Sequence, residues 1–339
     1  MIPRTEASWQ RESTLSWQQQ LQQAITQADE LLAALELPLS LLAGARTASH
    51  PFALKVPRAF LSRMQKGNPN DPLLRQVLPI KEELISTDGY NTNPVGEQHH
   101  SPGIIQKYHG RVLLMVNGHC AVNCRYCFRR HFPYADNRLS RQQWLGVLKA
   151  IESDASITEV ILSGGDPLAS SDRQLAWLVQ QIANITHIQR LRIHTRLPVV
   201  IPDRITQSCL EWLSASRLQV VMVLHINHPQ EIDKSLKISL SKLKQRGITL
   251  LNQAVLLKGV NDSTASLEAL SIDLFSAGVL PYYLHLLDPV SGAAHFDLPK
   301  EKCLALYRGI QERLPGYLLP KLVQELKGEP SKTLVSAHL

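Results

Sequence analysis

Hydrophobic residues from position 111 onward fall into short runs that alternate with amphipathic segments of helical length. The runs are rich in β-branched residues, as is typical of buried strands, and cover 111–118, 158–166, 190–196, 218–227, 248–257 and 281–288. The amphipathic segments cover 140–153, 171–184, 202–216, 229–247, 262–278 and 299–314. Six strands that alternate with six helices predict βα units and a parallel sheet that is buried on both faces.

The number of βα units limits the architecture. Six units are too few for a closed eight-stranded barrel, although the order of elements is the same. We therefore predict an α/β protein with an open, partial (β/α)6 barrel of the TIM type, and a doubly wound sheet is the alternative that periodicity leaves open. In either case the chemistry lies at the carboxyl ends of the strands, where this sequence is rich in Cys, His, Asp, Asn and Gly.

The two ends of the chain have other patterns. Residues 18–37 carry apolar positions at helical spacing, short helices interrupted by Pro and Gly follow, and turn residues predict a loop over 86–102. After the last helix, 318–326 read as a short strand that precedes a turn. We expect a helical N-terminal region over 1–100, the barrel core over 101–315 and a short C-terminal segment over 316–339.

Composition and charge change this picture little. The chain has 339 residues, 44% of them hydrophobic and 19% charged, with no signal-peptide-like apolar core near its start. No apolar run reaches the roughly 18 residues of a membrane span, so we expect a soluble, cytoplasmic protein without a membrane partner. The net charge is +7, but the basic residues are spread and aromatic residues make up only 6%, which argues against direct nucleic-acid binding.

Cysteine is the residue that points to chemistry. Three of the five cysteines, Cys120, Cys124 and Cys127, follow the first apolar run with the spacing C-x3-C-x2-C. Thiolates that one loop supplies bind zinc or an iron–sulfur cluster. His131 could complete a closed Cys3His zinc site, whereas a [4Fe–4S] cluster on three thiolates keeps the open coordination position that catalytic metal sites share. The spacing alone leaves both interpretations open.

The triplet, at the end of the first strand of a βα repeat, resembles the radical S-adenosylmethionine superfamily. Tyr126 before the third cysteine and the SGGD run after the second strand fit the signature of that superfamily. The resemblance implies a radical SAM barrel with a [4Fe–4S] cluster on the three cysteines. It also implies S-adenosylmethionine on the unique iron, cleaved to a 5′-deoxyadenosyl radical. The residues implied for S-adenosylmethionine in this run are Ser163, Gly164, Gly165 and Asp166.

Over residues 100–335 the chain resembles the lysine 2,3-aminomutases, and among them the branch that supplies β-lysine for the modification of elongation factor P. The stretches that carry the resemblance are RVLLMVNGHCAVNCRYCFRRHF, ILSGGDPL, HINHPQE, LNQAVLLKGVND, PYYLHLLD and EPSKT. It implies an isomerase that uses pyridoxal phosphate beside S-adenosylmethionine and turns free L-lysine into (R)-β-lysine. It also implies a reductant such as flavodoxin or ferredoxin and a functional link to elongation factor P and its lysyl ligase. A homo-oligomer stays open.

The resemblance assigns a role to each matching residue for the organic cofactors. Lys332, in the C-terminal segment, would form the Schiff base with pyridoxal phosphate. Arg111 and Tyr108 match positions near the same cofactor, and Lys107 stands where the family has an arginine. The positions that would line both organic cofactors are His225 and Gln253.

The residues implied for the substrate lie at three separate places in the chain. Arg129 would bind the α-carboxylate, since a guanidinium suits a planar carboxylate. Asp288 and Glu325 would face the distal ammonium, and Glu325 stands where the fermentative enzymes have an aspartate, which changes the fit to lysine. Two carboxylates argue against an acidic substrate, although a radical enzyme for another amino acid is an alternative. A structural Cys3His zinc protein would leave SGGD and Lys332 unexplained.

Overall fold

One open sheet forms the centre of the computed structural model, which describes residues 15–97, 103–134 and 139–335. The sheet has nine strands in sequence order, β1 to β9. Seven of them pair in parallel: β2 (Arg111–Asn117), β3 (Glu159–Gly164), β4 (Arg190–Thr195), β5 (Gln219–Leu224), β6 (Thr249–Val255), β7 (Leu280–His285) and β8 (Lys321–Gln324). The short strands β1 (Ile104–Ile105) and β9 (Thr333–Leu334) extend it antiparallel at opposite ends. The predicted partial barrel is confirmed, with β2–β7 as its six predicted strands.

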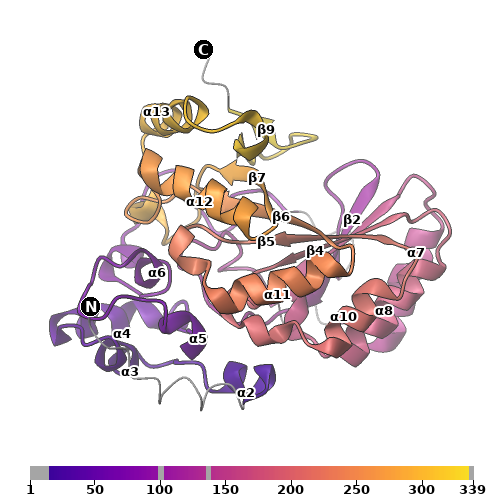
Figure 1. Cartoon of the computed structure of the whole chain (residues 1–339), viewed down its shortest axis with the longest axis horizontal. Helices are drawn as coiled ribbons and strands as arrows, with labels where there is room; N and C mark the ends of the chain where they lie inside the picture. Colours follow the sequence, from indigo (N-terminus) through magenta and orange to yellow (C-terminus); the bar gives the residue numbers. More distant parts are fainter. Residues whose placement is uncertain (1–14, 98–102, 135–138, 336–339) are drawn as a thin grey trace.

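Helices cover the outer face of this sheet (Figure 1). They are α7 (Arg141–Glu152), α8 (Asp172–Asn184), α9 (Leu197–Val200), α10 (Gln207–Ser214), α11 (Lys234–Gln245), α12 (Thr264–Ser276) and α13 (Lys300–Gln311). Five of the longer ones begin where a side-chain oxygen accepts a backbone N–H of the first turn, which satisfies a donor that the helix itself leaves unpaired. These N-cap residues are Ser140, Ser171, Thr206, Asp233 and Ser263.

The N-terminal region consists of short helices rather than one long one. They are α2 (Trp17–Gln22), α3 (Ala28–Ala34), α4 (Leu42–Ser49), α5 (Arg58–Leu61) and α6 (Pro72–Arg75). The helical pattern over 18–37 is broken because Ile25 and Val56 exchange two backbone hydrogen bonds, 2.8 and 2.9 Å long, in an isolated bridge. A tertiary pairing therefore overrides local helix propensity. Of the predicted loop, residues 98–102 lie outside the described residues.

The inner face of the sheet is polar. Along β4, the side chains of Leu191, Ile193 and Thr195 are buried, whereas those of Arg192 and His194 are only partly buried. Because side chains alternate between the two faces of a strand, the apolar set packs on the helices and the polar set faces the barrel interior. A polar interior is where a barrel of this kind holds ligands rather than core.

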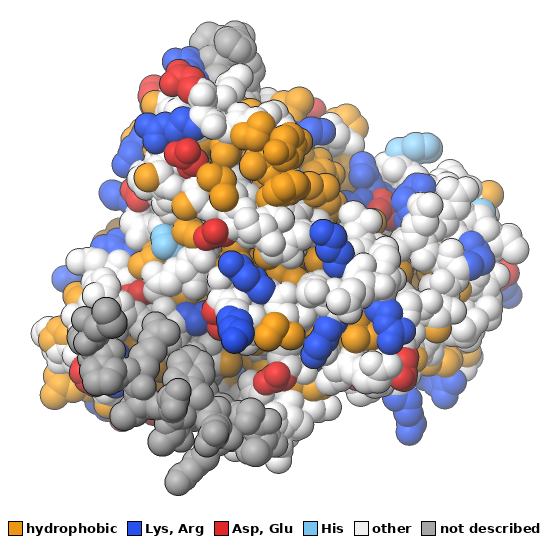
Figure 2. All heavy atoms as spheres, in the orientation of Figure 1, with side chains coloured by type: hydrophobic (Ala, Val, Ile, Leu, Met, Phe, Trp, Pro, Cys, Tyr) orange, Lys and Arg blue, Asp and Glu red, His pale blue; other side chains and the backbone are white. Residues whose placement is uncertain are grey.

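The outer surface carries mixed charge. On the face shown in Figure 2, Lys and Arg are scattered among other side chains, and hydrophobic side chains gather where α12 and β7 lie in Figure 1. Among the exposed hydrophobic residues of these elements and their neighbourhood are Phe275 and Tyr317, whose rings are 5.3 Å apart. In the described part of the chain, no helix combines the length and the apolar character of a membrane span.

Candidate active site at the carboxyl ends of the strands

The N-terminal region holds the loop that carries the three cysteines. This cysteine loop, residues 118–134, follows β2. The Lys55 ammonium donates to the carbonyl of Cys120 at 2.8 Å. The backbone N–H of Arg125 donates to the carbonyl of Gln76 at 2.9 Å. The helices before the barrel thus fix the backbone of the predicted cluster site.

A buried ion-pair network anchors the same loop. The side chains of Arg125 and Glu83 are fully buried, and their closest contact is 2.6 Å. Arg130 adds a second contact to Glu83 at 2.8 Å. Arg125 also donates to the carbonyl of Phe52 at 2.7 Å. One carboxylate and several backbone carbonyls therefore accept hydrogen bonds from both guanidinium groups, although Arg130 Nε has no partner, and such pairing lowers the cost of burying these charges.

The three thiols are half-buried, and they influence one another's pKa. Burial and the neighbouring Cys124 raise the pKa of Cys127 to about 11, and burial together with the other two thiols raises the pKa of Cys120 well above its ordinary value. Soft sulfur donors on one loop fit an iron–sulfur cluster, whose iron charge would favour the thiolate form. His131 does not join them, because its Nε2 contacts the carbonyl of Ser291 at 3.1 Å. The Cys3His zinc interpretation therefore gains no support.

An arginine from the β4 end reaches the triplet. Arg196 Nη1 lies 2.8 Å from Cys124 Sγ and 2.6 Å from the Tyr126 hydroxyl. Its other nitrogen, Nη2, donates to Gln76 at 2.6 Å and to Glu231 at 3.0 Å. The chain thus places a fixed, buried cation beside one cysteine sulfur, and hydrogen bonds to sulfur are among the features that tune such clusters.

The glycine pair brings the end of β3 against the cysteine loop. Gly164 has φ +121°, and a Cβ there would lie 2.4 Å from the carbonyl oxygen of Asn117. A Cβ at Gly165 would lie 2.7 Å from the carbonyl oxygen of His119. Only glycine permits both the backbone conformation and this close approach. The two loops that would hold the cluster and S-adenosylmethionine are therefore in direct backbone contact.

Asp166 lies at the end of β3, within the predicted SGGD run, and its carboxylate has four donors from the protein itself. Its carboxylate accepts a hydrogen bond from the Thr195 hydroxyl at 2.7 Å and from the backbone N–H groups of Arg196, Leu197 and Leu168 at 2.8, 2.8 and 3.0 Å. The carboxylate is thus fully used in tying the end of β3 to the end of β4. Asp166 shapes the proposed cofactor site without offering it a free side chain.

Arg129 already holds a carboxylate of the chain itself. Glu97, from the loop before β1, contacts Arg129 Nη2 at 2.5 Å and Nε at 2.9 Å in a bidentate pair. Arg129 Nη1 donates to Ser163 Oγ at 3.1 Å. Burial lowers the pKa of Arg129, but Glu97 outweighs burial and raises it. The sequence prediction of a carboxylate-binding arginine gains a physical basis, although it missed Glu97.

Glu325 is the centre of the second half of the site. Its carboxylate accepts hydrogen bonds from Lys332 Nζ at 2.6 Å, from Lys107 Nζ at 2.5 Å and from the Tyr108 hydroxyl. Burial favours protonation of Glu325, yet Lys332 and Lys107 lower its pKa to about 2. Lys332 is therefore not a solvated tail lysine. Tyr108, implied by the resemblance to lie near pyridoxal phosphate, contacts this carboxylate.

Four buried nitrogen atoms on the inner face have no hydrogen-bond partner in the described protein. They belong to Arg111 (Nε), His194 (Nε2), Gln253 (Nε2) and His285 (Nε2). Such groups are rare in folded proteins, and a polar ligand is one explanation for them. Two of them, Arg111 and Gln253, were predicted as cofactor residues, and the two histidines were missed.

The histidines of the inner face are neutral. Burial, followed by nearby cations that include Lys332, lowers the pKa of His194 and His285 well below the ordinary value. The predicted His225 differs from them, because its Nε2 lies 2.7 Å from the Tyr126 hydroxyl. His225 therefore connects the barrel interior to the cysteine loop. Alternation along β4 and β7, toward strand ends rich in polar residues, was the signal that could have found His194 and His285.

Asp288 lies between the two halves. Burial raises its pKa to about 7, with Glu325 and Glu97 adding to the shift while Lys332 and Lys107 oppose it. The charges of these five residues therefore influence one another, although the residues come from the segment around β1, the loop after β7 and the C-terminal segment. The structure thus places Asp288 and Glu325 in one electrostatic neighbourhood with Glu97, the carboxylate that pairs with Arg129.

Comparison with known proteins identifies the family. Residues 114–267 match the radical SAM superfamily. An L-lysine 2,3-aminomutase of Escherichia coli (strain K12) is 50% identical over 326 residues, which is 95% of this chain and 95% of that protein. The chain belongs to the L-lysine 2,3-aminomutase family. The predictions of an enzyme, an isomerase of the radical SAM superfamily with a [4Fe–4S] cluster and S-adenosylmethionine, are thereby confirmed.

Other members of the L-lysine 2,3-aminomutase family show the same relation. The protein so named from Haemophilus influenzae is 49% identical over 321 residues, 94% of this chain and 95% of that protein. The one from Clostridium subterminale is 30% identical over 334 residues, 98% of this chain and 79% of that protein.

Among solved structures, a radical SAM methyltransferase from Sphaerobacter thermophilus has 19% identity and a TM-score of 0.45, covering 65% of this chain and 68% of that one.

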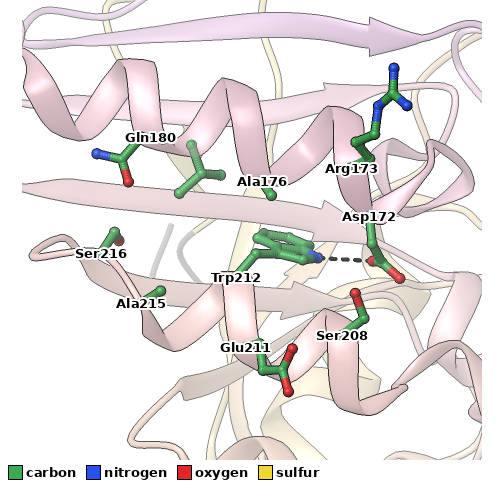
Figure 3. A pocket seen from close by; sticks show the side chains of 10 residues that line it. Asp172, Arg173, Ala176, Gln180, Ser208, Glu211, Trp212, Ala215 and Ser216 are labelled. Carbon is green, nitrogen blue, oxygen red and sulfur yellow. Dashed lines mark hydrogen bonds between the residues drawn. The ribbon is translucent and has the colours of Figure 1, made fainter.

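A groove on the outside of the barrel is separate from the site. It lies between α8 and α10, with Arg173, Ala176 and Gln180 on one side and Ser208 and Glu211 on the other (Figure 3). Inside it, Trp212 Nε1 donates to the carboxylate of Asp172 at 2.9 Å. None of the predicted site residues lines this groove.

Proposed function

We propose that the chain is an L-lysine 2,3-aminomutase that turns free L-lysine into (R)-β-lysine with the help of pyridoxal phosphate, supplying β-lysine for the modification of elongation factor P. The observation that carries the proposal is that Arg129 holds the carboxylate of Glu97, which shares an electrostatic neighbourhood with Asp288 and Glu325. A carboxylate-binding guanidinium lies at one side and two carboxylates at the other, which matches the charges at the two ends of lysine. The similarity to L-lysine 2,3-aminomutases of Escherichia coli and Haemophilus influenzae supports the same reaction.

The site residues would divide between three groups. Cys120, Cys124 and Cys127 would hold the cluster. The 163–166 run, His225 and Gln253 would line S-adenosylmethionine. Lys332, Arg111 and Tyr108 would hold pyridoxal phosphate, and the partnerless Nε of Arg111 fits an anionic cofactor group. When bound, the cluster and S-adenosylmethionine supply a hydrogen-abstracting radical, and pyridoxal phosphate supplies an electron sink.

The contacts of Glu325 suggest how the site would recognise the distal ammonium of lysine. Lys332 Nζ now occupies one oxygen of Glu325 at 2.6 Å. When Lys332 carries the cofactor instead, that oxygen loses a cation. The distal ammonium of the substrate would restore the charge there, with Asp288 as the second carboxylate. Lys107, which contacts the other oxygen of Glu325, would keep the buried carboxylate compensated in either case.

The barrel interior would protect the reacting carbon atoms. Neutral His194 and His285 offer no ammonium-like charge to repel the substrate. The N-terminal helices hold the backbone of the cysteine loop in place, and the helices of the barrel cover the outer face of the sheet. Positioning and exclusion of water are what the protein contributes to chemistry that a bound radical source performs.

The proposal includes several features beyond the site. We place the enzyme in the cytoplasm, where thiols stay reduced, with flavodoxin or ferredoxin as the electron donor and elongation factor P with its lysyl ligase downstream. We also keep the three-part division at residues 100 and 315 as the working description of the chain.

An anaerobic assay tests the proposal. Reconstituted protein is incubated with L-lysine, S-adenosylmethionine, pyridoxal phosphate and dithionite, and the products are analysed by mass spectrometry after chiral derivatisation. We expect (R)-β-lysine from the natural chain and none from Cys124→Ala. Release of 5′-deoxyadenosine without β-lysine would contradict lysine as the substrate while leaving the radical chemistry in place.

A further inference from the structure

The donors of Arg129 are almost all in use. A guanidinium has five N–H donors. Glu97 takes the one on Nε, at 2.9 Å, and one on Nη2, at 2.5 Å. Nη1 donates to Ser163 Oγ at 3.1 Å and to the carbonyl of Gly164 at 3.4 Å. A single N–H on Nη2 remains, so an incoming carboxylate finds no pair of parallel donors while Glu97 is in place.

From this geometry we infer that Glu97 is a specificity-determining residue, an internal carboxylate that holds Arg129 until the α-carboxylate of the substrate replaces it. The inference rests on the proposed function, in which Arg129 binds the α-carboxylate of lysine. It goes further because it makes binding an exchange of one carboxylate for another. The side chains of Arg129 and Glu97 are only 9% and 11% exposed. Leaving the buried charge of Arg129 without a carboxylate partner would therefore cost free energy.

The exchange selects for a free carboxylate. A ligand with an α-carboxylate compensates Arg129 as Glu97 leaves it. A ligand without one, such as an amine or a lysine linked through its carboxyl group, offers no anion for the buried guanidinium and leaves the Glu97 pair intact. The site would therefore reject protein-attached lysine of that kind through Arg129 rather than through its size.

The backbone around Glu97 confines the movement to a side chain. Asn93 Oδ1 accepts a hydrogen bond from the Glu97 backbone N–H at 3.1 Å, and Asn93 Nδ2 donates to the Glu97 carbonyl at 3.4 Å. Gly96, just before it, packs against the side chain of Lys327. Rotation about the side-chain bonds of Glu97 is enough to free the Arg129 donors.

Thermal unfolding of the holoenzyme without reductant tests the exchange apart from turnover. The variant is Glu97→Gln, and the matched control is Glu159→Gln. Glu159 forms an equally bidentate pair with Arg192, at 3.0 and 2.5 Å, with similar exposure, at the opposite end of the strands. The probes are L-lysine, L-alanine and 1,5-diaminopentane, which lacks a carboxylate. The KM for L-lysine is measured separately with reductant.

We expect both variants to unfold at lower temperature than the natural chain. L-Lysine and L-alanine should stabilise Glu97→Gln more than the natural chain, whereas the diamine should not, and Glu159→Gln should respond to each probe as the natural chain does. The KM for L-lysine should fall about tenfold in Glu97→Gln, the equivalent of one charged hydrogen bond no longer competing. A KM that rises, or carboxylate probes that stabilise Glu97→Gln no more than the natural chain, would overturn the inference.

Failure of the proposed function gives a different result from failure of the inference on Glu97. If the natural chain makes no β-lysine, the proposed reaction is wrong, yet the contrast between L-alanine and the diamine in Glu97→Gln still decides whether Arg129 takes up an incoming carboxylate. If β-lysine forms but that contrast is missing, the proposed function stands and Glu97 only orients Arg129.

Discussion

The cysteine loop and the C-terminal segment form the two sides of the proposed site, and they are built in opposite ways. The loop is fixed by the fully buried pair of Arg125 and Glu83 and by backbone bonds from the N-terminal helices. The segment joins the sheet through β8, which pairs with β7, but its last residues are held by the two-residue strand β9 and by the ion pair of Lys332 with Glu325, in which the lysine is 23% exposed. A metal cluster needs ligands that stay in place, whereas a lysine that must change partners needs contacts that can be exchanged.

The same difference appears at the two arginines of the site. Arg196 is surrounded by Cys124 and Tyr126 of the cysteine loop, by Gln76 of the N-terminal region and by the fully buried carboxylate of Glu231 after β5. Arg129 holds the single carboxylate of Glu97, from the loop before β1, in its main bidentate contact. Mutation of a rigid ion pair should therefore lower the free energy of unfolding. Mutation of an exchangeable ion pair should instead change substrate binding and turnover.

The largest effect on stability is expected at the rigid side. Glu83→Ala leaves Arg125 and Arg130 as buried cations without a carboxylate, which should lower the free energy of unfolding by about 3–5 kcal/mol. Urea unfolding measures it. Glu30→Ala, at the exposed pair with Arg58, is the control and should cost less than about 1 kcal/mol. Equal losses in the two variants would remove the basis for calling the loop rigid.

At the substrate residues the expected effect is on turnover. Asp288→Asn removes one of the two carboxylates for the distal ammonium and should lower kcat/KM for L-lysine by about 100-fold, as the loss of a buried charge partner does. Steady-state assays of β-lysine formation measure it. Activity within a few-fold of the natural chain would move the ammonium site away from Asp288.

The pH dependence sharpens the same point. Asp288 has a pKa of about 7 because burial and nearby carboxylates favour its neutral form. Only the ionised form attracts an ammonium, so kcat/KM for L-lysine should rise with pH below about 7, up to tenfold per pH unit, and level off above it. A profile that is flat between pH 6 and roughly pH 8 would contradict this role.

The smallest effect on stability is expected at the exchangeable side. Lys332→Ala should change the free energy of unfolding by less than about 1 kcal/mol, because the pair is partly exposed and Glu325 keeps Lys107 and Tyr108. The same variant should make no β-lysine. Lys321→Ala, at an exposed lysine of β8, is the control and should retain activity. A Lys332→Ala protein that fails to fold would place this lysine among the structural residues instead.

Much of the fold could be predicted from the sequence because it depends on short-range patterns. The apolar runs and amphipathic segments of the barrel correspond to strands β2–β7 and helices α7, α8 and α10–α13, whereas the short helix α9 was not predicted. The cysteine triplet and the glycine pair were predicted because each is local and each has a strict chemical or steric requirement. The helical pattern over 18–37 does not show that the helix is broken there into α2 and α3. The break depends on the bridge between Ile25 and Val56, which are distant in the chain.

By itself, the sequence determined the order of elements, the family and the residue types that carry the chemistry, because periodicity and short motifs are properties of neighbouring residues. Only the tertiary structure decided which charges meet. Glu97 on Arg129, Lys107 on Glu325, Arg196 beside Cys124 and Thr195 on Asp166 each join residues that are far apart in the chain. Charge pairing in a buried site depends on distance in space, which no local pattern encodes.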